Sequence, residues 1–198
     1  MRVLATVGFS FAAGLFLTLL PWDGWQLYAA GALALASLLW ALLGRGTPHL
    51  RRVLLVLLPL MVSLLYFTAY RALVRQPVQA LCGGEHDFSA AVCDWPEATE
   101  HGAKVTIRLH GFPGAKAVYY GDDDLLSLRP GDALSGTAWW NDVAAIGDGD
   151  LRQFSSRGVY ALLYDRDTLA VQPAPDMPLG YAPQYASKAL RDKLAQLW

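Results

Sequence analysis

The sequence has 198 residues, of which 54% are hydrophobic and only 17% are charged. A soluble domain carries about 25% charged residues, and the deficit lies in the first seventy residues, which hold four Arg and one Asp. The remainder holds twelve Lys or Arg against sixteen Asp or Glu, a balance of −4, which argues against a domain that wraps nucleic acid by charge alone.

Residues 1–76 predict a transmembrane anchor of about three helices. Apolar runs without a charge cover residues 3–20, 25–43 and 53–70, and at 1.5 Å per residue each nearly crosses a hydrocarbon core of about 30 Å. The runs are apolar on all sides, which disfavours buried helices of a soluble protein. A cleaved signal peptide is also disfavoured, because the first run is long and a second apolar run follows it.

The loops between these runs predict the orientation of the chain. The loop at 44–52 holds Arg45, Arg51 and Arg52, whereas the loop at 21–24 holds no positive charge. The positive-inside rule places the Arg-containing loop in the cytoplasm. We therefore expect a multi-pass protein of the cell membrane, with a cytoplasmic N-terminus and with residues 71–198 mainly extracytoplasmic.

Residues 77–172 change to a period of two, which is typical of β-strands. Candidate strands lie at residues 87–92, 104–109, 115–120, 133–140 and 158–164, and residues 168–171 extend the sheet. Five short strands separated by Gly and Pro turns predict an all-β domain, an OB-like five-stranded barrel. The gap at 141–157 suits a short helix over the barrel end. The spacing alone leaves an SH3-like barrel or a small sandwich open.

Residues 173–198 predict a proline-rich linker, over 173–183, and an amphipathic helix, over 184–198. The apolar face of this helix consists of Ala186, Leu190, Leu194, Leu197 and Trp198. No Gly or Pro stop signal follows the helix, a pattern typical of the front part of a longer protein.

The candidates for a ligand surface are cations and aromatic residues on the middle strands. Lys104 and Arg108 alternate with apolar residues and so face outward on the second strand, and Lys116 is the expected neighbour on the third. In OB folds this face binds oligonucleotides, and aromatic rings supply stacking platforms for bases. The aromatic candidates are Tyr120 and Trp139, together with their neighbours Tyr119 and Trp140. The alternative interpretation is an ordinary solvated strand face beside core aromatics.

Cys82 and Cys93 form a disulfide candidate, because a disulfide persists outside the cytoplasm. An extended strand from residue 86 to Cys93 separates its ends by roughly 23 Å at about 3.3 Å per residue. Bonded cysteines need α-carbons within about 7 Å. A chain reversal at Gly83 and Gly84 would permit the bond, so the sequence leaves the pairing open.

No catalytic site, metal site or cofactor is predicted. The histidines, His49, His86, His101 and His110, form neither an HxH nor an HExxH pattern. The Asp-rich stretches at 122–124 and 148–150 lack the EF-hand spacing and stabilise turns instead. Ser155 and Ser156 lack the context of a nucleophile elbow. The sequence therefore predicts a protein that is not an enzyme.

Several motifs together resemble the N-terminal region of the ComEC family, membrane proteins that take up DNA in natural transformation. The motifs are VCDWPE at 92–97, LRPGDAL at 128–134, Gly136 and Thr137 in the strand that follows, and FSSRGVY at 154–160. The order of anchor, OB-like domain and amphipathic helix is also that of the family. The resemblance implies that the external domain guides DNA to a channel region absent from this chain, and it carries over no catalytic residue.

The expected partners follow from this resemblance and from the candidate surface. They are the lipid bilayer, single- or double-stranded DNA held weakly, and the channel region of the same protein or other competence proteins. Two alternatives remain. One is a free-standing membrane-anchored scaffold, similar to NfeD-type proteins, whose OB-like domain binds a protein partner. The other is a small extracytoplasmic hydrolase, which the survey of candidate sites disfavours.

Overall fold

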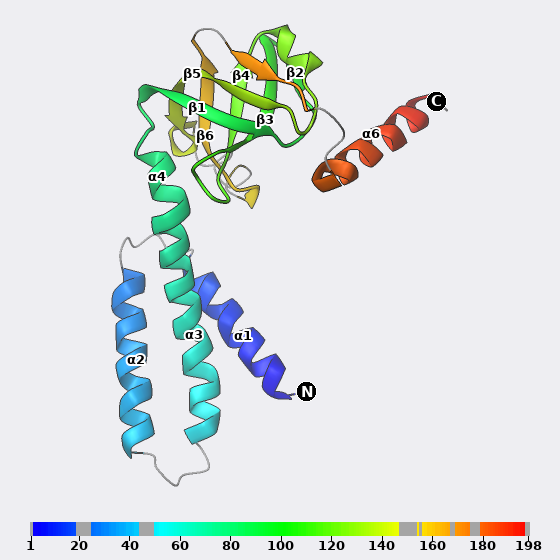
Figure 1. Ribbon diagram of the computed structural model, residues 1–198. Helices are drawn as coiled ribbons and strands as arrows, with labels where there is room; N and C mark the ends of the chain where they lie inside the picture. Colours follow the sequence, from blue (N-terminus) through cyan, green and yellow to red (C-terminus); the bar gives the residue numbers. More distant parts are fainter. Residues whose placement is uncertain are drawn as a thin grey trace. The chain divides into compact units, whose positions relative to one another are not determined.

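The computed structural model describes residues 2–18, 25–43, 50–146, 154, 156–166, 169–174 and 179–196 (Figure 1). The chain falls into two compact units, Met1–Leu73 and Val74–Trp198, called the helical unit and the barrel unit below. The predictions made for His49, for the 148–150 turn, for Ser155, and for Leu197 and Trp198 lie outside the described residues.

The helical unit contains α1 (Arg2–Leu17), α2 (Trp25–Leu43) and α3 (Leu50–Tyr70), which coincide with the three apolar runs. Both α1 and α2 pack against α3. The helical path of α3 continues through a π-helical turn, η1 (Arg71–Arg75), into the short helix α4 (Gln76–Gln79). The wider π-turn lies just before Pro77, where an α-helical carbonyl would meet the proline ring.

One of the three predicted membrane crossings meets the length requirement within the described residues. The helix Arg52–Gln79 has 28 residues and is long and apolar enough to cross a membrane. The other two apolar helices are shorter, Val3–Leu17 and Trp25–Trp40. The sequence places the end of the third run at Tyr70, where charge returns, but the backbone stays helical to Gln79. Arg71 and Arg75 do not end it, because Arg is a good helix former.

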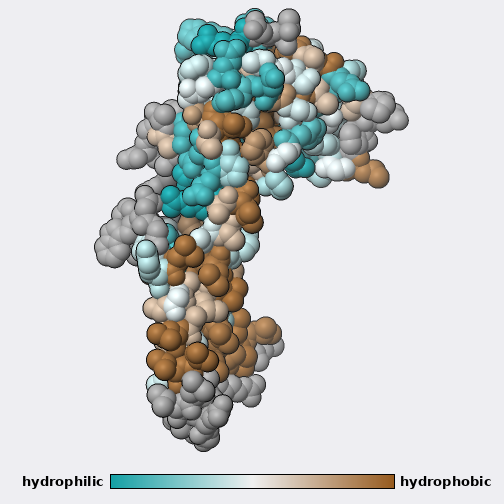
Figure 2. Space-filling view, turned by 60° about the vertical axis from the view of Figure 1, so that its left-hand side comes forward, coloured by the Kyte–Doolittle hydropathy of each residue, from teal (hydrophilic) through white to brown (hydrophobic). Residues whose placement is uncertain are grey.

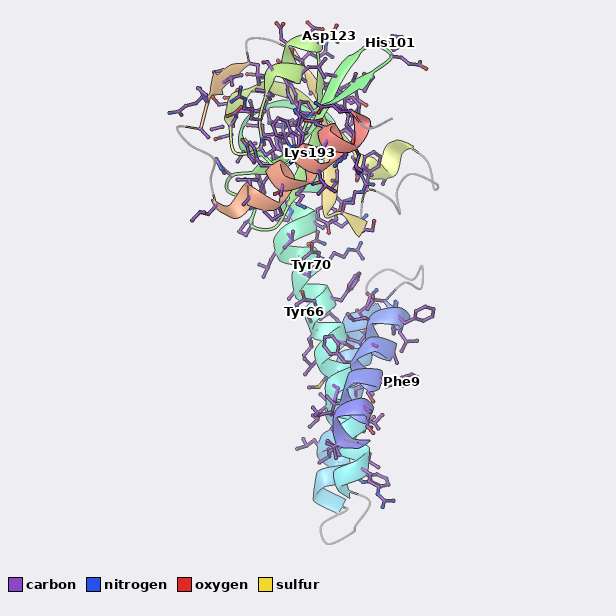
Figure 3. All side chains as sticks on the ribbon, turned by 90° about the vertical axis from the view of Figure 1, so that its right-hand side faces the viewer. Phe9, Tyr66, Tyr70, His101, Asp123 and Lys193 are labelled. Atoms are coloured by element: carbon purple, nitrogen blue, oxygen red, sulfur yellow. The ribbon has the colours of Figure 1, made fainter. Side chains whose placement is uncertain are left out.

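Small residues bring α1 close to α3. A Cβ atom at Gly14 would meet Ser63 Oγ and would lie 3.1 Å from the Leu60 carbonyl oxygen. Ser63 is fully buried, and its hydroxyl donates to the Leu60 carbonyl at 2.7 Å, which satisfies this polar group. Large apolar side chains such as Phe9 remain exposed (Figure 3), and apolar surface gathers over this unit (Figure 2). This surface is compatible with lipid contact.

The barrel unit is built on a closed five-stranded β-barrel. Its strands are β1 (Gly84–Val92), β3 (Gly102–Leu109), β4 (Lys116–Gly121), β5 (Ala133–Asp142) and β6 (Val159–Asp165). They pair in the order β1-β3-β4-β6-β5, and β5 pairs back with β1. Only the β4–β6 pair among these is parallel. The predicted five-stranded barrel is confirmed, and it is compatible with an OB-like barrel.

Two short strands extend the sheet. β2 (Glu97–Thr99) pairs with β3, and β7 (Ala170–Gln172) pairs with β5. β7 agrees with the expected extension of the sheet, although Thr168 lies outside the described residues. The sequence pattern does not reveal β2, because three residues are too few for a period of two to be recognised.

Strand alternation fills the barrel with apolar side chains. On β3, Val105 and Ile107 are buried, and Thr106 between them faces outward. Phe88 from β1 packs against Tyr119 from β4, with ring centroids 5.3 Å apart. Trp140 of β5 is 1% exposed, and its indole N–H donates to the His86 carbonyl at 3.2 Å. The polar group of this large ring is therefore satisfied inside the barrel.

The segment after β5 begins with a 3-10 turn, η3 (Val143–Ile146). Phe154 and Ser156 are helical, and the rest of the short helix predicted within 141–157 lies outside the described residues. Val143 packs with Val118, Val159 and Leu162, and Tyr120 and Phe154 join this cluster. Val118 and Leu162 occupy outward positions of β4 and β6. Because these outward positions are apolar, they need a cover, and η3 supplies it.

The turn that carries part of the family resemblance has a structural role. Gly131 has a φ of 105°, which favours glycine, and its N–H donates to the Val92 carbonyl at 2.9 Å. The buried Asp132 carboxylate accepts from the backbone N–H groups of Arg129, at 2.7 Å, and Ala174, at 2.9 Å. The Pro-Gly-Asp turn thus connects β1, β5 and the segment after β7.

Two further elements follow β7, η4 (Leu179–Tyr181) and α6 (Ala182–Ala195). The predicted amphipathic helix is present and begins slightly earlier than residue 184. Its predicted apolar face is exposed, with Leu190 at 65% and Leu194 at 51%. The helix contacts the barrel through its other face, which carries Tyr185 and Lys188.

Two glycines at turns give a matched test of the barrel. Gly102 has a φ of 122°, and a Cβ atom there would meet the Gly121 carbonyl oxygen, whereas Gly111, with a φ of 84°, has nothing within 4 Å. We expect Gly111→Ala to lower the free energy of unfolding by about 1–2 kcal/mol, and Gly102→Ala by about 3 kcal/mol or more, because strain and a backbone clash add. Thermal unfolding followed by circular dichroism measures both, and equal losses would contradict the close β3–β4 approach.

Candidate nucleic-acid interface

The outward face of β3 and β4 carries the predicted cations. Arg108 is the cross-strand partner of Lys116, so the two side chains leave the sheet next to each other. Two like charges at adjacent positions repel one another unless an anion lies between them. This pair is the centre of the candidate interface.

A third cation joins this pair from a distant part of the sequence. Arg157 lies in the turn before β6, where the Lys116 N–H donates to the Gly158 carbonyl at 3.0 Å. Arg108, Lys116 and Arg157 line a cavity of about 650 Å³, together with Tyr181 and Gln184 from η4 and α6. This cavity, called the basic cavity below, has the size of ordinary small-ligand sites. Sequence reasoning missed Arg157, because no local pattern links it to β4.

The basic cavity also has acidic and neutral walls. Asp94 and Glu97 line it alongside the cations, with Thr106 on the strand between. Burial raises the pKa of Tyr181, the nearby Cys93 thiol acts in the same direction, and Arg108 opposes them. The three cations that line the cavity outnumber its two carboxylates by one. The cavity therefore attracts anions only moderately.

Lys104 does not take part in the basic cavity. Its ammonium forms an ion pair with Glu97 Oε2 at 3.0 Å, because β2 places Glu97 directly opposite Lys104. An exposed pair of this kind contributes little to stability, but it offsets the charge that Lys104 would offer to a ligand. Because the sequence pattern does not reveal β2, it does not predict that Glu97 pairs with Lys104.

Two of the four aromatic candidates lie inside the barrel, so they are wrong as stacking surfaces. Tyr119 and Trp140 are each 1% exposed. The Tyr119 hydroxyl donates to Asp165 Oδ1 at 2.7 Å, and burial, followed by this hydrogen bond and the charge of Asp165, raises its pKa. Neighbouring residues of a strand face opposite sides of the sheet, so only Tyr120 and Trp139 are on the outside.

Tyr120 and Trp139 belong to an aromatic row across three strands. Tyr164 of β6 stacks on Tyr120, with centroids 5.3 Å apart and planes at 13°, and it is the register partner of Trp139 on β5. The Arg166 guanidinium lies 5.6 Å from the centroid of the Trp139 ring. The row therefore joins the two predicted aromatics through a residue that the sequence analysis did not select.

The aromatic row borders a second cavity of opposite charge. Tyr120 and Tyr164 line a space of about 600 Å³ together with carboxylates from three positions, Glu100, Asp122 and Asp165. His101, labelled in Figure 3, also lines it. This acidic cavity repels phosphate groups, so the predicted cations and aromatics do not form one continuous nucleic-acid surface.

The cysteines are both free thiols, so the disulfide candidate is not formed. Cys82 precedes β1 and Cys93 follows it, and the nine-residue strand between them holds them apart. Burial, with a smaller contribution from Asp142, raises the pKa of Cys82 to about 11. Burial also raises the pKa of Cys93, against the opposing charges of Arg108 and Lys116.

Within the described residues, no group of three His, Cys, Asp or Glu side chains is placed to hold a metal ion. The carboxylates at 122–124 lie instead at the start of the 3-10 helix η2 (Asp123–Ser127), where acidic residues are favourable. No protein-family model, curated protein or solved structure matches this chain.

The free thiols lead to a test of the local fold. Because the pKa of Cys82 is about 11 against an ordinary value of 9.0, the folded protein holds this proton more tightly than the unfolded chain. We expect iodoacetamide to modify Cys82 about 100-fold more slowly in the folded than in the unfolded protein at pH 8, and faster as the pH rises toward 11. Mass spectrometry on a Cys93→Ser variant measures the rate.

The same labelling, done on the unfolded chain without reductant, distinguishes free thiols from a disulfide. Both cysteines should be alkylated. A chain that takes up label only after reduction would show that Cys82 and Cys93 pair.

Proposed function

We propose that this chain is the N-terminal portion of a ComEC-type membrane protein for DNA uptake, whose external barrel guides DNA toward a channel. The observation that carries the proposal is the basic cavity, where Arg108, Lys116 and Arg157 converge from β3, β4 and the turn before β6. Phosphate groups are the anions that such a cluster of Arg and Lys recognises. The proposal assigns no catalysis to the chain.

The position of the cavity supports an OB-type binding mode. Counting only the barrel strands, β3 and β4 are the second and third strands in the chain, and the barrel closes through β4–β6 and β1–β5. In OB folds the face of the second and third strands binds oligonucleotides. Arg108 and Lys116 lie on that face, and Arg157 is next to it.

The charge distribution favours a guide over a strong clamp. Among the described residues, three cations line the cavity. Lys104 is paired with Glu97, and the acidic cavity lies at the turn between β2 and β3. Affinity that rests on three phosphate contacts is low and falls with salt. Recognition of the backbone also carries no sequence information, which suits a protein that must accept any DNA.

The membrane part of the proposal is a multi-pass anchor in the cell membrane, with the N-terminus in the cytoplasm and residues 71–198 mainly outside. One helix of sufficient length, Arg52–Gln79, and the exposed apolar side chains of α1 and α2 support it. The Arg-rich loop supports the orientation.

This orientation can be tested by labelling in intact cells. In a background with Cys82 and Cys93 replaced by Ser, we expect a membrane-impermeant maleimide to label Gly149→Cys from outside, and to label Gly46→Cys only after permeabilisation. The physical reason is retention of the Arg loop on the cytoplasmic side. Labelling of Gly46→Cys in intact cells would reverse the topology.

A second candidate function is a membrane-anchored scaffold similar to NfeD-type proteins. The acidic cavity favours it, because carboxylates beside the stacked Tyr120 and Tyr164 rings suit a cationic side chain of a protein partner rather than DNA. In this alternative the basic cavity would bind no nucleic acid.

Titration of the full chain in detergent with fluorescent oligonucleotides decides between the two functions. We expect weak binding of single strands at low salt, and loss of most of it in the triple variant Arg108→Ala, Lys116→Ala, Arg157→Ala. The slope of log affinity against log salt should fall by about 2, since each single-strand phosphate contact contributes about 0.7. The control is the double variant Lys104→Ala, Glu97→Ala, which removes both members of an ion pair, leaves the net charge unchanged and should change the affinity little.

Two results would contradict this assignment. Undiminished binding by the triple variant would place the DNA site elsewhere on the chain. Absence of binding by the folded wild-type protein at low salt would favour the scaffold.

A further inference from the structure

The cations of the basic cavity have no carboxylate partner in the part of the chain that the structure describes. Two carboxylates lie in the wall of the cavity, but both are engaged elsewhere. Glu97 pairs with Lys104 at 3.0 Å, and Asp94 Oδ1 accepts from the Trp95 N–H at 2.9 Å. Cations that are gathered without a paired counter-charge attract an anion from solution.

An anion reaches these cations directly from solvent. Arg108 and Arg157 are exposed, and Lys116 is half-buried. The neutral part of the wall adds the hydroxyl-bearing side chains of Thr106 and Tyr181. Arg, Lys and hydroxyl side chains are the groups that proteins use to bind phosphate oxygens. The basic cavity therefore has the chemistry of a phosphate site.

The wall that η4 and α6 contribute is attached to the barrel through Trp95. The Trp95 ring meets the Tyr185 ring edge-on, with centroids 5.2 Å apart, and its indole N–H donates to the Gln184 carbonyl at 3.3 Å. These contacts keep Tyr181 and Gln184 in the wall of the cavity. The phosphate site is thus bounded by protein on this side and is not a flat strip of cations.

The positive charge of the cavity does not continue along β3. Toward the start of this strand the next outward cation is Lys104, which Glu97 offsets. Beyond it lies the acidic cavity, with Glu100 and Asp122. Successive phosphates of a strand laid along β3 would meet first an offset cation and then carboxylates. The surface therefore suits the end of a strand better than a long run of phosphates.

We propose that the basic cavity binds a phosphate monoester, which on a nucleic-acid strand is its phosphorylated end. A monoester carries about −1.5 to −2 charges at pH 7, whereas an internal phosphodiester carries one negative charge. Two guanidinium groups and one ammonium group line a single cavity, and guanidinium binds phosphate through two parallel hydrogen bonds. Such a cluster favours the phosphate with the higher charge. The inference rests on the proposed function for its nucleic-acid part, since a free nucleotide offers the same group.

The experiment compares three forms of one short single-stranded oligonucleotide, bound by the full chain in detergent at low salt. The forms end in a 5′-phosphate, a 5′-hydroxyl group or a 5′-phosphate methyl ester, which keeps the phosphate and removes its second charge. The fluorescent label is at the other end, and the same three forms are made at the 3′ end. We expect a terminal monoester to bind about tenfold more tightly than a hydroxyl end, because it adds charge-assisted hydrogen bonds. The methyl ester should bind nearly as weakly as the hydroxyl form.

Three single variants locate the site. Arg157→Gln removes an exposed cation of the cavity and should reduce the preference for the monoester to about twofold. Arg166→Gln is the matched control, because this exposed arginine lies against Trp139 and outside the cavity, and it should keep the preference. Asp94→Asn removes a carboxylate from the wall and should tighten binding of the phosphorylated form about threefold. A variant that fails to fold could not produce this gain.

A monoester preference that Arg157→Gln reduces and Arg166→Gln retains supports the inference. Equal binding of the three forms at both ends overturns it, and the proposed function then still stands if the triple variant of the three cations loses binding. A preference that Arg157→Gln leaves unchanged also overturns it, because the strand end would be recognised elsewhere.

Thymidine 5′-monophosphate, titrated by calorimetry, separates the two sources of the monoester. If no oligonucleotide binds but this nucleotide does, and Arg157→Gln weakens it, the proposed strand-binding function fails and the cavity is a site for a free phosphate monoester. Absence of binding by the nucleotide and by every oligonucleotide, with the protein folded, overturns both.

Discussion

The parallel pairing of β4 with β6 is the constraint on which the rest of the barrel unit depends. It joins β4, which follows β1 and β3 in the order of the sheet, to β6, which is followed by β5. The pairing register shifts between Lys116 and Ala117. Through this pairing the turn before β6 comes next to Lys116, which adds Arg157 to the cation pair. It also sets Tyr164 on Tyr120. Parallel neighbours need a long connection, and here that connection supplies the apolar cover of the outer face through Val143.

Strand alternation then decides which side chains form the core and which face solvent. The dipeptides Tyr119-Tyr120 and Trp139-Trp140 look equivalent in the sequence, yet one ring of each pair is 1% exposed and the other faces outward. The inward rings are fixed by packing and hydrogen bonds, as in the Tyr119 hydroxyl on Asp165. A shift of one residue in register would exchange all of them at once, so the core and the outer surface are specified together.

Two cavities of opposite charge lie at different positions along β3 and β4, and β2 borders both of them. Glu97 lines the basic cavity and Thr99 lines the acidic one, with the Lys104–Glu97 ion pair at the same edge. A polyanion is attracted by Arg108 and Lys116 in the basic cavity and repelled by the carboxylates of the acidic cavity. Gln184, in the first turn of α6, also lines the basic cavity, so the helix contributes to the shape of this cavity.

The sequence by itself determined the three apolar helices, the five barrel strands and the C-terminal helix, because periods of 3.6 and 2 are local properties of the chain. It also placed Arg108 and Lys116 on the outward face, since they alternate with buried residues of their own strands. It did not determine where the third helix ends, because Arg71 and Arg75 remain in a continuous helix. Only the tertiary structure decided that Arg157 joins the cations, that Glu97 pairs with Lys104, that Cys82 and Cys93 stay apart, and that α6 docks on Trp95. Each of these depends on residues far apart in the chain, whose meeting is set by strand pairing and packing rather than by any local pattern.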